Sequence, residues 1–162
     1  MTFIPYIKTV KEVSGLVRQR WGACRYDGKS FNWLYEDHLT NPPGGGSFGI
    51  RSIIEDHEEK FWLCNTWYRY TIEPNDAAEE EGLLNYKRET GIDGLKAPDG
   101  DDVYYMSAVN DDKGDLWMAT YGAGVWRYDP SAELKTGSKN ITHYPVENGD
   151  KTVTLFSIHK IT

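Results

Sequence analysis

Alternation of apolar and polar positions predicts short β-strands along most of the chain. The clearest stretch is 103–129, where the residues change sides with a period of two and are rich in β-branched and aromatic types. Clusters of Asn, Asp and Gly at 110–114 and 122–124 interrupt it as turns. The stretch therefore predicts three strands joined by tight turns, at 103–109, 116–120 and 125–128.

The same pattern occurs earlier in the chain. Residues 48–62 align without a gap to residues 103–117, an offset of 55 residues. The matched pairs are Ser52 with Ser107, Asp56 with Asp111, and Trp62 with Trp117. A third copy is indicated by an Arg-Tyr pair that recurs at Arg25-Tyr26, Arg69-Tyr70 and Arg127-Tyr128. A fourth strand follows each pair, at 30–33, 83–86 and 141–144, and a new unit opens at 153–158.

Units of four short strands that repeat at roughly 50 residues are typical of β-propeller blades. We therefore expect an all-β fold, a β-propeller of about three four-stranded blades; the alternative is a sandwich with chance internal similarity. The expected organisation is a leader at 1–12, a first blade at 13–47 with a closing strand at 153–162, a second blade at 48–102 and a third at 103–152.

Three blades are too few to close, because propellers typically have 4–8. Residues 13–17 resemble the turn and second strand that should follow the strand at 153–162, so this last strand is expected to complete the N-terminal blade. The expected assembly is a homodimer that closes a ring; the alternatives are an open partial propeller and a truncated fragment.

One motif resembles a known repeat. Ile-x-Ser-Ile-x-Glu-Asp at 50–56, followed by Trp62 and Thr66, and the related series from Ser107 to Asp129 are similar to the repeat of the two-component regulator propeller family. In that family the propellers are extracytoplasmic sensor domains, often of receptors that detect carbohydrates and signal through histidine kinases, so the resemblance implies a propeller fold and a ligand-binding role. Those propellers have many more repeats, and the chain contains no kinase, receiver or DNA-binding region.

Composition narrows the function. A net charge of −7 and a pI near 5.1 argue against a nucleic-acid surface. No apolar run approaches the length of a membrane span. Residues 1–12 lack the features of a signal peptide, so the chain as it stands is expected in the cytoplasm, or in the periplasm or outside the cell if it is a piece of a longer sensor.

Candidate chemistry is sparse. Cys24 and Cys64 are expected to be buried free thiols rather than a disulfide, and they lack the spacing of a zinc site. The acidic stretch 110–115 reads as a β-turn rather than a calcium loop. No catalytic or cofactor-binding motif is present, so no cofactor or metal is expected. A non-catalytic ligand-binding or sensor module is the favoured function, and a propeller-type glycosidase or lyase is the alternative.

Five residues are predicted to line a ligand face. If the first strand of each blade starts at that face, the loops after the second and fourth strands also lie there. Aromatic residues directly after the second strand, and residues near the start of the first, then gather together: Trp21, Trp67, Tyr121, Tyr104 and Arg51. Aromatic faces with an Arg suit a sugar ring or an acidic glycan. The alternative is that these rings only fill interfaces between blades.

Overall fold

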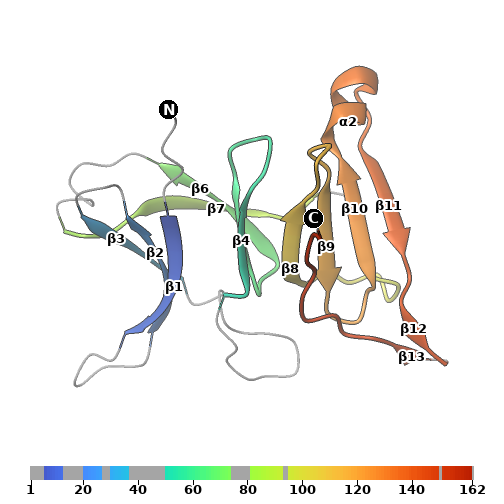
Figure 1. Cartoon of the computed structure of the whole chain (residues 1–162), viewed down its shortest axis with the longest axis horizontal. Coiled ribbons are helices and arrows are strands. Elements are labelled where there is room, and N and C mark those ends of the chain that lie inside the picture. The colour runs from blue at the N-terminus through green and yellow to red at the C-terminus, as the bar shows by residue number, and fades with distance from the viewer. Residues whose placement is uncertain are drawn as a thin grey trace.

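The protein is built mainly of β-strands arranged in three antiparallel sheets (Figure 1). The computed structural model describes residues 6–12, 20–26, 30–36, 50–73, 81–92, 95–149 and 151–161. One short helix and a two-stranded hairpin complete the described elements. The all-β prediction is confirmed, and the described strands form no closed sheet.

Each sheet keeps the order of its strands along the chain. The N-terminal sheet contains β1 (Tyr6–Glu12), β2 (Arg20–Tyr26) and β3 (Phe31–Tyr35). The central sheet contains β4 (Ser52–Glu55), β5 (Phe61–Cys64), β6 (Tyr68–Glu73) and β7 (Asn85–Thr90). The C-terminal sheet contains β8 (Tyr105–Asn110), β9 (Leu116–Thr120), β10 (Val125–Asp129) and β11 (Asn140–Tyr144). Helix α2 (Pro130–Thr136) joins β10 to β11, and the hairpin of β12 (Glu147–Asn148) and β13 (Lys151–Thr152) follows.

Asp56 and Asp111 organise the same turn in the central and C-terminal sheets. The Oδ1 atom of each accepts the backbone N–H groups two and four residues further on. The Oδ2 atom accepts an indole N–H, from Trp62 at 2.8 Å and from Trp117 at 3.0 Å. These matched contacts support the alignment of 48–62 with 103–117.

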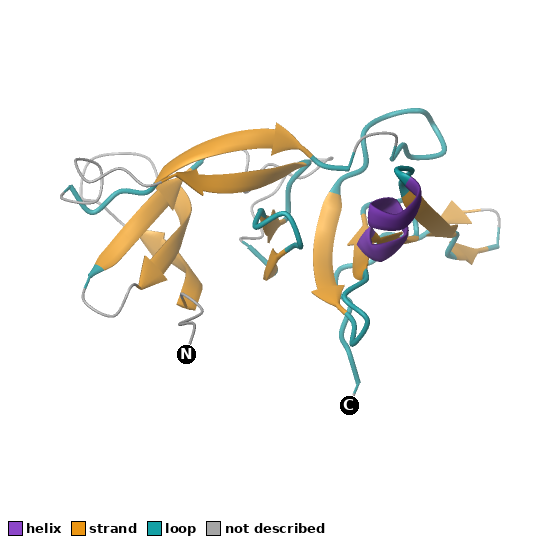
Figure 2. Cartoon of the chain, turned by 90° about the horizontal axis from the view of Figure 1, so that it is seen from above, coloured by secondary structure: helices purple, strands orange, loops and turns teal. Residues whose placement is uncertain are grey.

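The central sheet is covered on both faces because neighbouring residues of a strand point to opposite sides. Leu63 of β5 packs in a core shared with the N-terminal sheet, together with Ala23 and Leu34. Trp62 and Cys64, on either side of Leu63, belong instead to a core shared with the C-terminal sheet. Seen from above, the sheets lie next to one another across the molecule (Figure 2).

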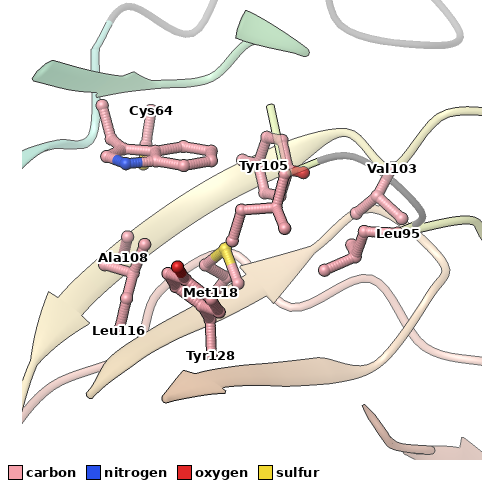
Figure 3. Close-up of a cluster of buried hydrophobic side chains, with 10 residues drawn as sticks. Cys64, Leu95, Val103, Tyr105, Ala108, Leu116, Met118 and Tyr128 are labelled. Atoms are coloured by element: carbon pink, nitrogen blue, oxygen red, sulfur yellow. The ribbon is translucent and has the colours of Figure 1, made fainter. Parts of the chain in front are cut away.

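The core between the central and C-terminal sheets is the larger of the two clusters. Trp62 packs edge-on against Tyr105, with ring centroids 4.8 Å apart. Figure 3 shows how side chains from both sheets and from the connection between them converge there: Cys64, Leu95, Val103, Tyr105, Ala108, Leu116, Met118 and Tyr128. Removal of this apolar surface from water, worth roughly 25 cal/mol per Å², holds the two sheets together.

The N-terminal sheet has three described strands where the other two sheets have four. Tyr6 of β1 pairs with Tyr26 of β2, just as Leu116 of β9 pairs with Tyr128 of β10. Strand β1 therefore holds the second position of the repeat, although 1–12 was predicted as a leader outside the blades. Residues 13–17, predicted as the turn and second strand, lie outside the described residues.

Residues 153–161 take no regular strand conformation, and they are not paired with any of the three described strands of the N-terminal sheet. The segment instead runs beside the C-terminal sheet, where Figure 1 places the C-terminus near β8 and β9. Its backbone contacts there include a bond from the Leu155 N–H to the Thr120 carbonyl. None of the described strands lies beside this segment as the second strand of a further sheet.

Candidate functional site

A cavity of about 700 Å³ lies at one end of the central and C-terminal sheets. Its lining comes from the segments that follow β5, β7 and β9, together with the residues that lead into β8. β5 and β9 are second strands, β7 is a fourth strand and β8 is a first strand. The cavity therefore lies where the loops after the second and fourth strands were predicted to meet the start of a first strand. The volume falls in the range of roughly 300–1,000 Å³ typical of small-molecule sites.

Three aromatic residues form one wall of the cavity. Trp67 meets Tyr104 edge-on, with ring centroids 4.4 Å apart, and Tyr104 meets Tyr121 edge-on at 6.5 Å. Tyr104 is buried, whereas Trp67 is half-buried and Tyr121 is 40% exposed. The middle ring therefore supports two outer rings that a ligand could reach.

Tyr104 is held firmly in this position. Its hydroxyl donates to the Asn65 carbonyl at 2.6 Å, and its own carbonyl accepts the Tyr121 N–H at 3.0 Å. Burial raises the pKa of the Tyr104 phenol well above its ordinary value, so the group stays protonated and remains a donor. On the other side, the Gly91 N–H donates to the Trp67 carbonyl at 3.2 Å and ties β7 to the same wall.

Carboxylates line the cavity from the connection between β7 and β8. A tight turn brings them there: the Ala97 N–H donates to the Asp101 carbonyl and the Gly100 N–H to the Ala97 carbonyl, both at 2.9 Å. Gly100 has a φ of 90°, a conformation that favours glycine. Two more lining carboxylates, Asp99 and Asp102, belong to this turn or directly follow it.

The charge balance of the cavity is negative. Its charged lining residues are Lys96, Asp99, Asp101 and Asp102. The Lys96 ammonium lies 2.5 Å from Asp102 Oδ1 and offsets that carboxylate. Both partners are more than half exposed, so the pair adds little to stability. The remaining carboxylates favour hydrogen-bond donors or cations and disfavour an anionic ligand.

The structure brings together three of the five predicted site residues. Trp67, Tyr104 and Tyr121 line one cavity. Arg51 is not among the lining residues; its guanidinium lies 5.0 Å from the centre of the Phe156 ring. Trp21 belongs to β2 of the N-terminal sheet, and its side chain lies outside the described residues.

Sequence reasoning missed the acidic side of the cavity. The available signal was the Pro-Asp-Gly turn at 98–100, placed after a fourth strand and followed by two further aspartates. Among the described residues, no group of His, Cys, Asp and Glu has the geometry of a metal site. Cys24 and Cys64 are both free and buried, as predicted.

No helix in the part of the chain that the structure describes is long and apolar enough to cross a membrane. Comparison of the chain with protein-family models, with curated proteins and with solved structures finds no match.

Proposed function

We propose that the protein is a non-catalytic, ligand-binding module of the propeller type, whose ligand is a neutral carbohydrate held in the cavity between the central and C-terminal sheets. The observation that carries the proposal is the aromatic wall. Trp67 and Tyr121 occupy the same position of the repeat and flank the buried Tyr104 in one cavity. Carboxylates from the following connection complete the lining.

Repeated contacts support the propeller part of the proposal. The Asp-to-indole bond recurs in the central and C-terminal sheets, and each indole also lies beside an arginine from the third strand. Arg69 lies 5.9 Å from the Trp62 ring centre and Arg127 lies 5.7 Å from that of Trp117. Equivalent side chains thus play equivalent parts in successive sheets, as expected of blades around an axis. The resemblance to two-component regulator propellers points to a sensor role.

Two features of the lining favour a neutral sugar. Aromatic rings bind the apolar faces of pyranose rings, and carboxylates accept hydrogen bonds from sugar hydroxyls. An acidic glycan, which the sequence also suggested, is disfavoured because Arg51 is not among the lining residues and the lining has more carboxylates than ammonium groups. An amino sugar fits the same charge balance, so the test includes both classes.

Isothermal titration against a panel of neutral, amino and acidic oligosaccharides tests the proposal. The wild-type chain should bind members of the first two classes and not the third. Trp67→Ala and Tyr121→Ala should each weaken binding by about tenfold or more, the equivalent of about 1.4 kcal/mol. A reducing-end assay on the same mixtures should detect no hydrolysis, because a glycosidase or lyase is the competing function.

Tyr144→Ala is a matched control. Tyr144 and Tyr121 are both 40% exposed, but Tyr144 is not a lining residue of the cavity. Loss of one exposed ring should therefore matter only at Tyr121. The site would be refuted if Trp67→Ala bound a sugar as tightly as the wild-type protein. It would also be refuted if Tyr121→Ala and Tyr144→Ala lost equal affinity for that sugar.

A further inference from the structure

The segment 153–161 makes the same backbone contact with the C-terminal sheet that β8 makes with the central sheet. The Tyr105 N–H donates to the Thr66 carbonyl at 2.9 Å, and the Leu155 N–H donates to the Thr120 carbonyl at 3.1 Å. Thr66 follows β5 by two residues and Thr120 is the last residue of β9, and the two threonines occupy matching positions in the aligned sequences. The donors lie 50 residues apart in the chain, the spacing at which Ser157 takes the place of Ser107.

A second bond repeats at the same spacing. The Ala108 N–H donates to Ser52 Oγ at 2.9 Å, and the Ile158 N–H donates to Ser107 Oγ at 3.4 Å. In both cases the serine of one first strand accepts from the backbone of the next first strand. Residues 153–161 therefore lie where the first strand of a fourth sheet belongs.

Large side chains in the segment 153–161 and on the adjacent face of the C-terminal sheet are more exposed than the equivalent side chains one repeat earlier. Phe156 is 49% exposed, whereas Met106, its equivalent in β8, is 1% exposed. Trp117 is only half-buried, whereas Trp62, its equivalent in the central sheet, is 1% exposed because the C-terminal sheet packs over it. The outer face of the C-terminal sheet thus leaves a large apolar side chain partly exposed, whereas its equivalent in the central sheet is buried under a neighbouring sheet.

The N-terminal sheet has the complementary gap. Its described strands hold the second, third and fourth positions of the repeat, and β1 forms its edge. An edge strand presents unpaired backbone N–H and C=O groups and is a ready site for pairing with another strand. Among the described residues, 153–161 lie at a first-strand position with no second strand beside them, and the N-terminal sheet has strands at its second to fourth positions but none at its first.

We propose that residues 153–161 of one copy pair with β1 of a second copy and complete its N-terminal sheet, which then covers the outer face of the first copy's C-terminal sheet. The register follows from the C-terminal sheet, in which Ser107 pairs with Ala119 and Val109 with Trp117. The corresponding pairs between copies are Ser157 with Thr9, Ile158 with Lys8, and His159 with Ile7.

Two copies are enough to close the assembly. The described residues of each copy form three sheets with three or four strands, so two copies joined in both directions give six blades, within the roughly 4–8 typical of closed propellers. The contact is head-to-tail, and such contacts close into rings when the rotation fits. Closure by a second copy would cover the outer face of the C-terminal sheet and pair the edge of β1 in the same contact.

Cysteine cross-linking between two differently tagged copies tests the register. Thr9→Cys in one copy and Ser157→Cys in the other should give a disulfide-linked heterodimer on mild oxidation, because directly opposed residues in antiparallel strands have Cα atoms about 4.5–5.5 Å apart. Thr9→Cys with Ile158→Cys is the matched control; adjacent residues of a strand point to opposite faces, so this pair should give little heterodimer. The unsubstituted chain, whose two cysteines are buried, sets the background.

Three results would overturn the proposal. The first is equal cross-linking by the matched and shifted pairs. The second is an internal disulfide in a monomer that carries both Thr9→Cys and Ser157→Cys, which would mean that the segment completes the sheet of its own chain. The third is light scattering that gives the mass of one 18.5 kDa chain at micromolar concentration rather than twice that mass.

Discussion

Removal of the Trp62 side chain tests the packing between the central and C-terminal sheets. Trp62 is 1% exposed, meets Tyr105 edge-on at 4.8 Å and donates its indole N–H to Asp56. Trp62→Ala leaves a large cavity in the core and should cost about 3–5 kcal/mol. Trp62→Phe keeps most of the apolar contact but removes the bond to a charged acceptor, and should cost about 1.5–3 kcal/mol.

Urea unfolding followed by circular dichroism gives both values from the shift in midpoint at constant slope. Trp62→Ala should show the larger loss of stability. A domain of this kind is stabilised by only about 5–15 kcal/mol in total, so both losses should shift the midpoint measurably. If Trp62→Ala costs less than about 1 kcal/mol, the two sheets do not pack through this residue. If the two variants cost the same, the indole N–H, and not packing, determines its contribution.

Two further predictions concern the repeated turn. Glu59 and Gly114 hold matching positions with φ of 59° and 85°. Gly114→Glu should therefore cost about 1–2 kcal/mol of stability, while Glu59→Gly should cost nothing, and equal losses would mean that the turns differ. The bond from Trp117 holds the pKa of Asp111 below its ordinary value, so this carboxylate stabilises the fold above its unfolded pKa of about 3.9, and the contribution is lost as the pH falls through the lower folded pKa. Trp117→Phe should raise that pKa in an NMR titration and reduce the acid-dependent loss of stability; an unchanged pKa would contradict the bond.

Much of the fold could be predicted because the residues that recur in the repeat are the ones that make the same structural contacts in each sheet. Ser52 and Ser107 join successive first strands, and Asp56 and Asp111 fix the turns that follow. Side chains with such specific contacts leave a pattern that survives in a single sequence. The aromatic wall was predictable for the same reason, because Trp67 and Tyr121 share one position of the repeat.

The remaining features lack a repeated signal. Strand β1 carries Ile7 where the other two repeats have tryptophan, so it did not align. Among the described residues, the helix in the segment 130–139 has no counterpart in the other repeats; here Asp129 caps helix α2 through the Ala132 N–H and Gly137 ends it with a φ of 71°. The sequence signal for this helix is local and consists of its two capping residues, Asp129 and Gly137.

The connection that carries the acidic side of the cavity differs between repeats. Its position is set by tertiary packing of Leu95 and Val103 in the core between the two sheets. Sequence alone gave no counterpart with which to compare it. The position of Arg51 in the repeat predicted that it lies at the ligand face. In the structure its guanidinium lies over the ring of Phe156, in the segment 153–161.

The most direct test of the account is a titration of the tryptophan indole N–H signals by NMR while an oligosaccharide from the binding panel is added. Trp67→Phe assigns the signal of the cavity residue, and Trp62 serves as an internal reference because its N–H is bonded to Asp56 in the core. The account predicts a saturable shift at Trp67 with little change at Trp62. Binding without a shift at Trp67, or no binding by any member of the panel, would contradict it.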